Sequence, residues 1–313
     1  MALDGVARDL PAGGLPQRIV ILHLDSLACL PALSRLFAVL GDRIGFVVRS
    51  DRFAAGHGGL WRQGIGLLRR SGWRFTLALG FDLIAPRVAE VLLKPLRIMF
   101  KGTALLTVGQ HAVAAGARAM TVADINASGV VETVRAWRPD LVISLHFDQI
   151  LEERFITGVG APILNLHPAL LPRHRGPCPS FWTLSGHDRE AGISIHRIVD
   201  RSIDTGKVLA QAALPVAGTA SMKELDHALY LKGVDLLMQL LQRRSPIVSA
   251  AACTTDDGER HPSPGAYESF PSASEVAVGR ARGVRLWHFG HAARLLLAMA
   301  WQPKAVPSCR EPL

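Results

Sequence analysis

The chain has 313 residues, a length that allows one large domain or two modest ones. Apolar residues make up 49% of it and charged residues 19%, which excludes a disordered chain and indicates a buried core. The four cysteines lie far apart and form no C-x-x-C pair, a usage typical of free thiols in a reducing compartment. We therefore expect a globular, cytoplasmic protein.

The formal net charge is +9 and the isoelectric point is about 10.0. A basic surface attracts polyanions, so folate polyglutamate, nucleotide sugars, RNA and anionic lipid are all candidate partners. An arginine-rich composition without any polyanion partner explains the same charge. No secretory signal opens the chain, and no uncharged apolar run approaches the ~20 residues that span a bilayer. We expect no transmembrane segment, and contact with a membrane surface stays open.

The first predicted elements alternate between strands and helices. The apolar run from Arg18 to Leu24 predicts a buried strand, and 44–48 predicts a second one. Between them, apolar residues at helical spacing from Leu30 to Leu40 predict a helix. This opening predicts an α/β fold with an open, mostly parallel, Rossmann-like sheet and helices on both faces.

The segment from Arg52 to Lys101 departs from this alternation. It begins rich in glycine and then interleaves arginines with Trp61 and Trp73. Two functional interpretations are a polyanion site and a helix on a membrane surface. The structural interpretation is a pair of helices that cover the sheet with arginine stems along their edges, and the usual orientation of amphipathic helices favours it.

Strands and helices alternate again after this segment. Asn126 is placed to cap a helix, and Ser221 with Glu224 matches a capping box that opens a long helix ending near Arg244. Further strands are predicted at 119–122, 141–145, 162–166, 192–198 and 208–216, the last two as a hairpin pair. We expect a flexible leader at 1–17, a main domain at 18–244, a linker at 245–264 and a short C-terminal extension at 265–313.

The strand at 162–166 leads into the most informative stretch of the sequence. Strand alternation places Asn165 and His167 on one face, and Pro168 then ends strand pairing. An amide and an imidazole should therefore point together at the carboxyl end of a strand. Open α/β sheets bind their ligands at this edge.

A turn sequence follows about forty residues later and carries Asp204. An amide and an imidazolium can stabilise the oxyanion of an acyl transfer to an amine. A carboxylate can orient the imidazole, raise its pKa above about 6.5 and help to remove the amine proton. Singly, each residue has an ordinary structural explanation, since histidine is a common hydrogen-bonding residue and aspartate a common turn former.

Together these motifs resemble a known family. The stretches N-L-H-P-A-L-L-P, R-G-P, G-I-S-I-H and I-D-T-G-K-V-L are similar to the N-terminal domain of the 10-formyltetrahydrofolate-dependent formyltransferases. That family includes glycinamide ribonucleotide, methionyl-tRNA and sugar-amine formyltransferases. The resemblance is strongest from Pro139 to Val216. One departure is the sequence Leu24-Asp25-Ser26 after the first strand, where family members often carry glycine.

The resemblance implies roles for particular residues. Asn165 matches the oxyanion-binding asparagine, His167 the catalytic histidine, and Asp204 the aspartate that tunes the histidine and accepts a proton. Arg175 and Gly176 belong to the loop near the acceptor amine. The folate pocket is expected to be formed by Phe147, Gln149, Ile150, Leu151, Asp200 and Ile203.

The expected reaction is transfer of a formyl group from 10-formyltetrahydrofolate, as co-substrate, to the amine of a small metabolite, such as an amino sugar on a nucleotide carrier. The alternatives are a methionyl-tRNA formyltransferase, a formyltetrahydrofolate hydrolase and a non-catalytic folate or polyanion binding module. The short C-terminal extension favours a small-molecule acceptor over nucleic acid. The histidines show no metal-binding spacing, so no metal is expected. The sequence leaves the acceptor amine and the oligomeric state open.

Overall fold

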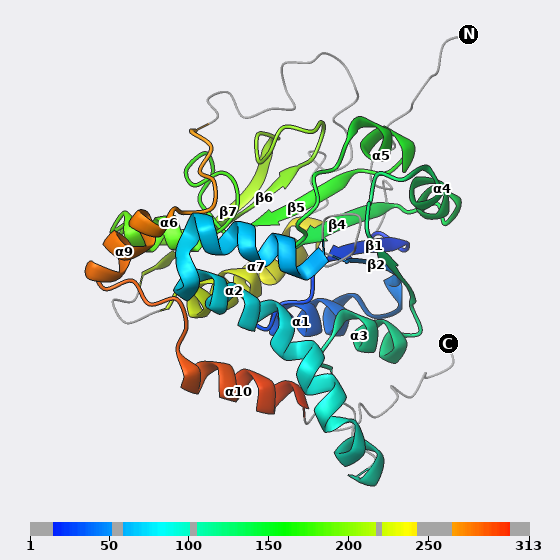
Figure 1. Ribbon diagram of the computed structural model, residues 1–313. Coiled ribbons are helices and arrows are strands. Elements are labelled where there is room, and N and C mark those ends of the chain that lie inside the picture. Colours follow the sequence, from blue (N-terminus) through cyan, green and yellow to red (C-terminus); the bar gives the residue numbers. More distant parts are fainter. Residues whose placement is uncertain (1–14, 52–58, 101–104, 217–220, 243–264, 301–313) are drawn as a thin grey trace.

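A seven-stranded sheet forms the centre of the protein (Figure 1). The computed structural model describes residues 15–51, 59–100, 105–216, 221–242 and 265–300. The strand order is β3-β2-β1-β4-β5-β6-β7, with β1 to β5 parallel, β6 antiparallel to β5 and β7 antiparallel to β6. The strands are β1 Ile19–His23, β2 Ile44–Ser50, β3 Arg118–Val122, β4 Leu141–Leu145, β5 Ile163–His167, β6 Glu190–Arg197 and β7 Val208–Pro215. The predicted open, mostly parallel sheet is confirmed.

Helices cover both faces of this sheet, as the sequence predicts. Alternate side chains of β1 point to opposite faces, so Ile19 and Ile21 enter one core and Val20 and Leu22 the other. The first core is closed by α1 Leu30–Leu40, α3 Val108–Ala115 and α7 Met222–Gln242. The second is closed by α4 Ser128–Ala136 and α5 Glu153–Gly158. Because β1 and β4 are covered on both sides, all their residues are buried, which explains their mostly apolar sequences.

The segment that interrupts the alternation forms α2, Gly59–Phe100, which is two helical parts joined at Gly72. Gly72 has φ 77° and ψ 167°, a conformation that breaks a helix and that glycine adopts readily. The inner side of α2 buries Phe75 and Leu83 against Leu24, which follows β1. The predicted pair of helices is confirmed, and it covers the carboxyl end of the sheet. No helix in the described ranges combines the length and the hydropathy of a bilayer-crossing segment.

The described part of the C-terminal extension, 265–300, packs on α2. It contains α9 Ala273–Ala281 and α10 Phe289–Ala300, both of which contact α2 (Figure 1). Trp287, just before α10, donates a hydrogen bond from its indole to the carbonyl of Ala78 at 2.9 Å. The predicted linker and most of the leader lie outside the described residues. The domain boundaries therefore stay predictions.

Two cap predictions have different outcomes. At Ser221 and Glu224 each side chain bonds the other residue's backbone N–H, so the capping box is confirmed. The prediction for Asn126 is wrong, because Ala127 is the N-cap of α4. The Asn126 side chain instead bonds Ile150 and Glu152 and holds the loop after β4. The Asn126 side chain therefore stabilises a loop that is distant in the sequence and does not cap its own helix.

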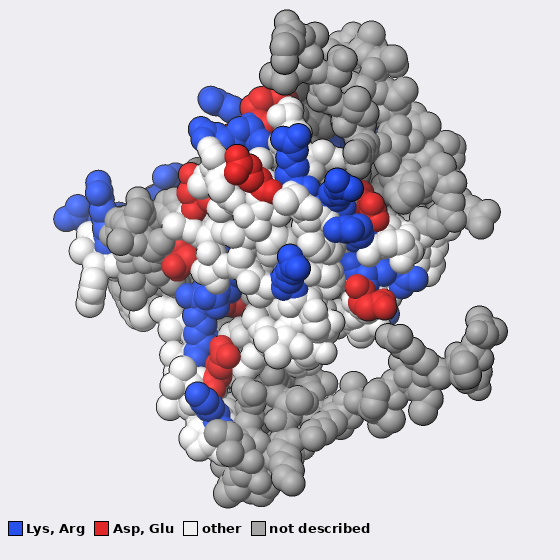
Figure 2. All heavy atoms as spheres, turned by 90° about the vertical axis from the view of Figure 1, so that its right-hand side faces the viewer, with Lys and Arg blue, Asp and Glu red and all other residues white. Residues whose placement is uncertain are grey.

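The basic residues do not cluster on the side of the molecule that carries α3 and α4. Figure 2 shows lysine and arginine side chains interspersed there with aspartate and glutamate. This face therefore offers no single basic field to a polyanion.

We expect the free energy of unfolding to decrease as the pH falls from about 6.5 towards 4. Burial lowers the pKa of His23 and of His111 to about 4, so both stay neutral in the folded protein. In the unfolded chain each takes up a proton near pH 6.5, so their full contribution to the free energy of unfolding is present above that pH. Each histidine should cost up to about 1.4 kcal/mol per pH unit within this window.

Urea denaturation at pH 7 and pH 5 measures this dependence. His23→Gln should flatten it, and the exposed His187→Gln should keep the wild-type slope. Identical slopes for wild type and His23→Gln would contradict the assignment.

Candidate active site

A cavity of about 360 Å³ lies at the carboxyl ends of β4 and β5. Its volume is typical of a small-molecule site. It is walled by the loop after β4, the connection from β6 to β7, and parts of α2, α7 and the C-terminal segment. The predicted site residues on its wall are Phe147, Gln149, Ile150, Leu151, Asn165, His167, Gly176, Asp200, Ile203 and Asp204. Arg175 is the one predicted site residue that is not among the lining residues.

Asn165, His167 and Asp204 lie together on this wall. The first two come from β5, where alternation places them on one face. Asp204 comes from the β6–β7 connection, where it has φ 52°. Its carboxylate is 3.5 Å from His167 Nδ1, and its other oxygen is 3.4 Å from Asn165 Nδ2. The sequence therefore predicts this juxtaposition, and the catalytic roles of the three residues stay predictions.

The Asp204 carboxylate is buried and remains ionised. Burial alone would raise its pKa, but the neighbouring His167 and His196 and a hydrogen bond from the Gly176 N–H together lower it by more than burial raises it. The net result is a pKa well below the usual range of an aspartate. The Gly176 N–H lies 2.9 Å from one oxygen, and His196 Nε2 lies 3.3 Å from the other.

His167 is neutral in the folded protein at neutral pH. Burial lowers the pKa of its imidazole below the ordinary 6.5, and this outweighs the opposite effect of Asp204. The expectation that Asp204 raises this pKa above 6.5 is therefore wrong, because the side chain is only 6% exposed and loses its hydration. Nε2 lies 2.9 Å from the carbonyl oxygen of His174 and donates a hydrogen bond to it. Both ring nitrogens thus face acceptors that would stabilise an imidazolium once it formed.

His196 is a site residue that the sequence analysis does not single out. It pairs with Asn165 across β5 and β6, and its Nε2 lies 3.1 Å from Asn165 Nδ2. It is buried and lines the cavity. The available signal was the alternation in G-I-S-I-H, which places the histidine at a strand end opposite Asn165.

The loop from 172 to 178 is held by the C-terminal extension. His174 lies between the carboxylates of Glu268, at 2.7 Å, and Asp188, at 3.0 Å. The backbone N–H of Glu268 donates to the carbonyl of Arg175 at 2.8 Å. The Arg175 guanidinium donates to the carbonyls of Ile203 and Gly265, so it braces the loop between two segments.

Gly176 is needed where the C-terminal segment crosses this loop. Its φ of 105° favours glycine, and an added Cβ would lie 2.3 Å from the carbonyl oxygen of Glu268 and 2.7 Å from the Tyr267 ring. The N–H that binds Asp204 is thus presented by a residue that only glycine can occupy without displacement of the C-terminal segment.

The turn from β1 to α1 is filled by a carboxylate of the chain itself. In doubly wound folds this turn and the following helix N-terminus bind phosphate groups. Here Asp82, from α2, accepts hydrogen bonds from the Ala28 N–H at 3.0 Å and the Ser26 hydroxyl at 2.9 Å. The segment that the sequence leaves without a definite role therefore occupies the position of an anionic ligand.

Asp82 is the end of a buried chain of charges. Lys223 Nζ lies 2.9 Å from Asp82 and 2.9 Å from Asp226. Burial alone would lower the pKa of Lys223, but the two carboxylates, Asp226 first, raise it well above the usual range. Lys223 and Asp226 line the cavity beside Tyr230, so a charged but internally paired group forms this wall.

Among the described residues, no three histidine, cysteine, aspartate or glutamate side chains are grouped in a way that could hold a metal ion. The absence of a metal stays a prediction.

Residues 106–241 match the family model described as formyl transferase. The match spans less than half of the chain, and over this stretch the chain is similar to the formyl transferase family. The matched stretch contains Asn165, His167 and Asp204, together with the two loops that wall the cavity. The resemblance found in the sequence motifs is confirmed.

The curated relatives include methionyl-tRNA formyltransferases. The protein of Finegoldia magna is 26% identical over 185 residues, which cover 58% of this chain and 59% of the relative. That of Chloroflexus aurantiacus is 35% identical over 114 residues, 36% of each chain. These matches span between about a third and three fifths of the relatives' length.

A solved structure with a related fold is the N-formyltransferase from Helicobacter canadensis in complex with folinic acid and dTDP-3-aminofucose. It superimposes with a TM-score of 0.50 at 15% identity and covers 80% of this chain and 70% of that one. This similarity supports the fold.

Replacement of Asp82 by alanine should lower the free energy of unfolding by about 3–5 kcal/mol, because Lys223 would keep a buried charge with one fewer partner. The matched control is Asp235→Ala, which removes the exposed Arg35–Asp235 ion pair and should cost less than about 1 kcal/mol. Chemical denaturation of both variants at pH 7 measures the difference. Equal losses would show that Asp82 contributes no more than a surface charge.

Proposed function

We propose that this protein transfers a formyl group from 10-formyltetrahydrofolate to a primary amine. The observation that carries the proposal is the ionised Asp204 beside His167 and Asn165 on the wall of a cavity of small-molecule size. The match of residues 106–241 to the formyl transferase family model supports the reaction class.

The donor fits the side of the cavity formed by the loop after β4 and the β6–β7 connection. Phe147, Ile150 and Ile203 give this side an apolar lining suited to a flat ring system. The Gln149 side chain bonds Ser50 and the N–H of Ile125, so it holds the loop in place and leaves the ligand to the loop's backbone and apolar groups.

The reaction forms a bond from the amine nitrogen to the formyl carbon and breaks the bond from that carbon to N10 of the folate. During attack the formyl oxygen becomes an oxyanion and the amine nitrogen becomes positively charged. An N–H of Asn165 donates a hydrogen bond to the oxyanion, since its long 3.4 Å contact with Asp204 is easily exchanged. Neutral His167 accepts the proton lost by the nitrogen and delivers it to N10 as the old bond breaks.

Asp204 acts as a fixed negative charge in this scheme. Its low pKa makes it a poor proton acceptor, so it stays ionised throughout. When His167 takes up the proton, its two N–H groups meet Asp204 and the His174 carbonyl. The transient imidazolium is therefore stabilised where it forms.

Methionyl-tRNA is the first acceptor to test, because the matching curated relatives are methionyl-tRNA formyltransferases. A small-metabolite amine is the second candidate. It is favoured by the C-terminal segment, whose Tyr267 and Phe270 line the cavity and narrow the approach of a large acceptor. Because Asp82 fills the β1–α1 turn, neither acceptor is expected to place a phosphate there.

Purified protein should be incubated with 10-formyltetrahydrofolate and either methionyl-tRNA or a pool of primary amines. Tetrahydrofolate release and the mass of the formylated product identify the acceptor. Release without any formylated amine would assign a hydrolase, and folate binding without turnover would assign a binding module.

His167→Ala and Asp204→Asn should each lower kcat at least about 10²-fold, with little change in folate affinity. The double variant should lose far less than the product of the two factors, because the residues act as one unit. The exposed Asp235→Asn is the matched control and should keep wild-type turnover. Near-wild-type turnover in folded Asp204→Asn would show that Asp204 serves only the turn.

A further inference from the structure

The outer side of α2 is apolar and uncovered in the described structure. After Gly72, exposed apolar side chains recur at helical spacing and form one stripe. Leu77 is 62% exposed and Val91 is 70% exposed. Exposed apolar residues that are isolated from one another are ordinary, whereas a continuous group of them is typical of an interaction surface. The stripe consists of Trp73, Leu77, Phe81, Val88, Val91 and Leu92.

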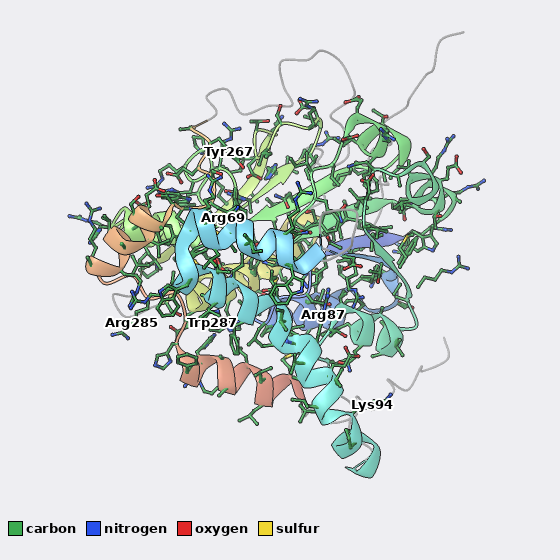
Figure 3. The ribbon with its side chains drawn as sticks, in the orientation of Figure 1. Arg69, Arg87, Lys94, Tyr267, Arg285 and Trp287 are labelled. Atoms are coloured by element: carbon green, nitrogen blue, oxygen red, sulfur yellow. The ribbon has the colours of Figure 1, made fainter. Side chains whose placement is uncertain are left out.

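The helix α10 extends this stripe. It packs beside α2, and the ring of Trp287, which precedes it, meets Phe81 at 5.4 Å. Its own exposed residues include Phe289 and Leu297. Figure 3 shows Trp287 between α2 and the start of α10, and Arg69, Arg87 and Lys94 in succession along α2. We call the stripe together with Phe289 and Leu297 the α2–α10 face.

The part of α2 before Gly72 repeats the pattern with arginines added. Trp61, Ile65 and Leu68 are exposed on one side, and Arg62 and Arg69 lie along the adjacent edge. Exposed aromatic and aliphatic residues flanked by arginines are typical of helices that lie in a membrane interface.

The charge around the α2–α10 face is mostly positive, although Glu90 is partly exposed on the same helix and Arg87 is paired with the buried Asp25. The α2 sequence holds seven basic residues and two acidic ones, and one of the acidic ones, Asp82, is buried. The α10 sequence has no acidic residue and one basic residue, Arg294. Any partner must therefore combine an apolar interior with negative charge at its boundary.

An anionic bilayer has both properties. Its acyl region accepts aliphatic and aromatic side chains, and its phosphates accept the arginines at the edge. RNA fits poorly, because four of the six residues of the stripe are leucine or valine, which neither bind phosphates nor stack on bases as aromatic rings do. A second copy of this chain would bring the same positive charge to the boundary and would repel it.

We propose that the α2–α10 face binds the surface of an anionic membrane, with α2 lying in the interface. Since Leu79 and Leu83 on the inner side of the same helix line the cavity, membrane binding would hold the cavity beside the lipid surface. This inference does not depend on the proposed formyl transfer.

Co-sedimentation of the full chain with phosphatidylcholine vesicles, with and without phosphatidylglycerol, tests it. We expect binding to the anionic vesicles and a decrease with salt. Each arginine near such a surface contributes about fivefold, so Arg62→Gln combined with Arg74→Gln should lower the partition coefficient about tenfold or more. Leu77→Ser combined with Val91→Ser should lower it to a similar extent, about tenfold, and folding should survive because both side chains are exposed.

Matched controls lie elsewhere on the surface. Val113→Ser replaces a side chain that is 80% exposed on α3, and Arg135→Gln replaces an exposed arginine on α4. Both should bind vesicles as the wild type does.

Results of three kinds would overturn the proposal. The first is no binding of the wild type to anionic vesicles at low salt, or equal binding by the Leu77→Ser/Val91→Ser variant. The second is a lipid-free dimer in light scattering that the same variant converts to a monomer, which assigns the face to a second copy. The third is a structured RNA that displaces the vesicles and binds this variant as tightly as the wild type, which assigns the arginines to RNA.

Discussion

The negative charge of Asp204 is the interaction on which the site depends. A buried carboxylate stays ionised only when hydrogen-bond donors and polar neighbours replace its lost water. The groups around Asp204 come from separate parts of the chain: Asn165 and His167 from β5, His196 from β6, and Gly176 from a loop that the C-terminal segment holds. A displacement of any one of these parts changes the ionisation of Asp204, so the fold and the chemistry are coupled through a single group.

Much of the fold is predictable from the sequence because the central strands are short, mostly apolar runs, such as 141–145, which are typical of buried strands in an α/β sheet. The location of Asn165 and His167 on the same face of one strand is predictable, because side-chain alternation depends only on the local sequence. The pKa of His167 is not, since it is set by side chains that close over it from other elements. Nor is the role of Asp82, because it depends on where the break at Gly72 directs the rest of α2. The prediction that Asn126 caps a helix is wrong for a similar reason, because its side chain bonds a loop that is distant from that helix in the sequence.

The segment from 59 to 100 links the two sides of the structure. Its inner surface supplies the carboxylate at the β1–α1 turn and part of the cavity wall, while its outer surface carries the uncovered apolar stripe. The contacts of its inner surface leave this helix little freedom to change its rotation. Lys223 strengthens this constraint, because it joins Asp82 of α2 to Asp226 of α7 inside the protein. The orientation of the apolar stripe is thus fixed from within.

The contact between His174 and Glu268 has a consequence for the order in which the protein becomes functional. The two residues are 94 positions apart in the chain, and Glu268 also meets the backbone of the loop that presents Gly176. During synthesis the ribosome delivers the whole sheet, β1 to β7, before Glu268 is made. A nascent chain can therefore complete its hydrophobic cores while the loop beside Asp204 is still unsupported. The site matures last, when the C-terminal segment emerges and binds across it.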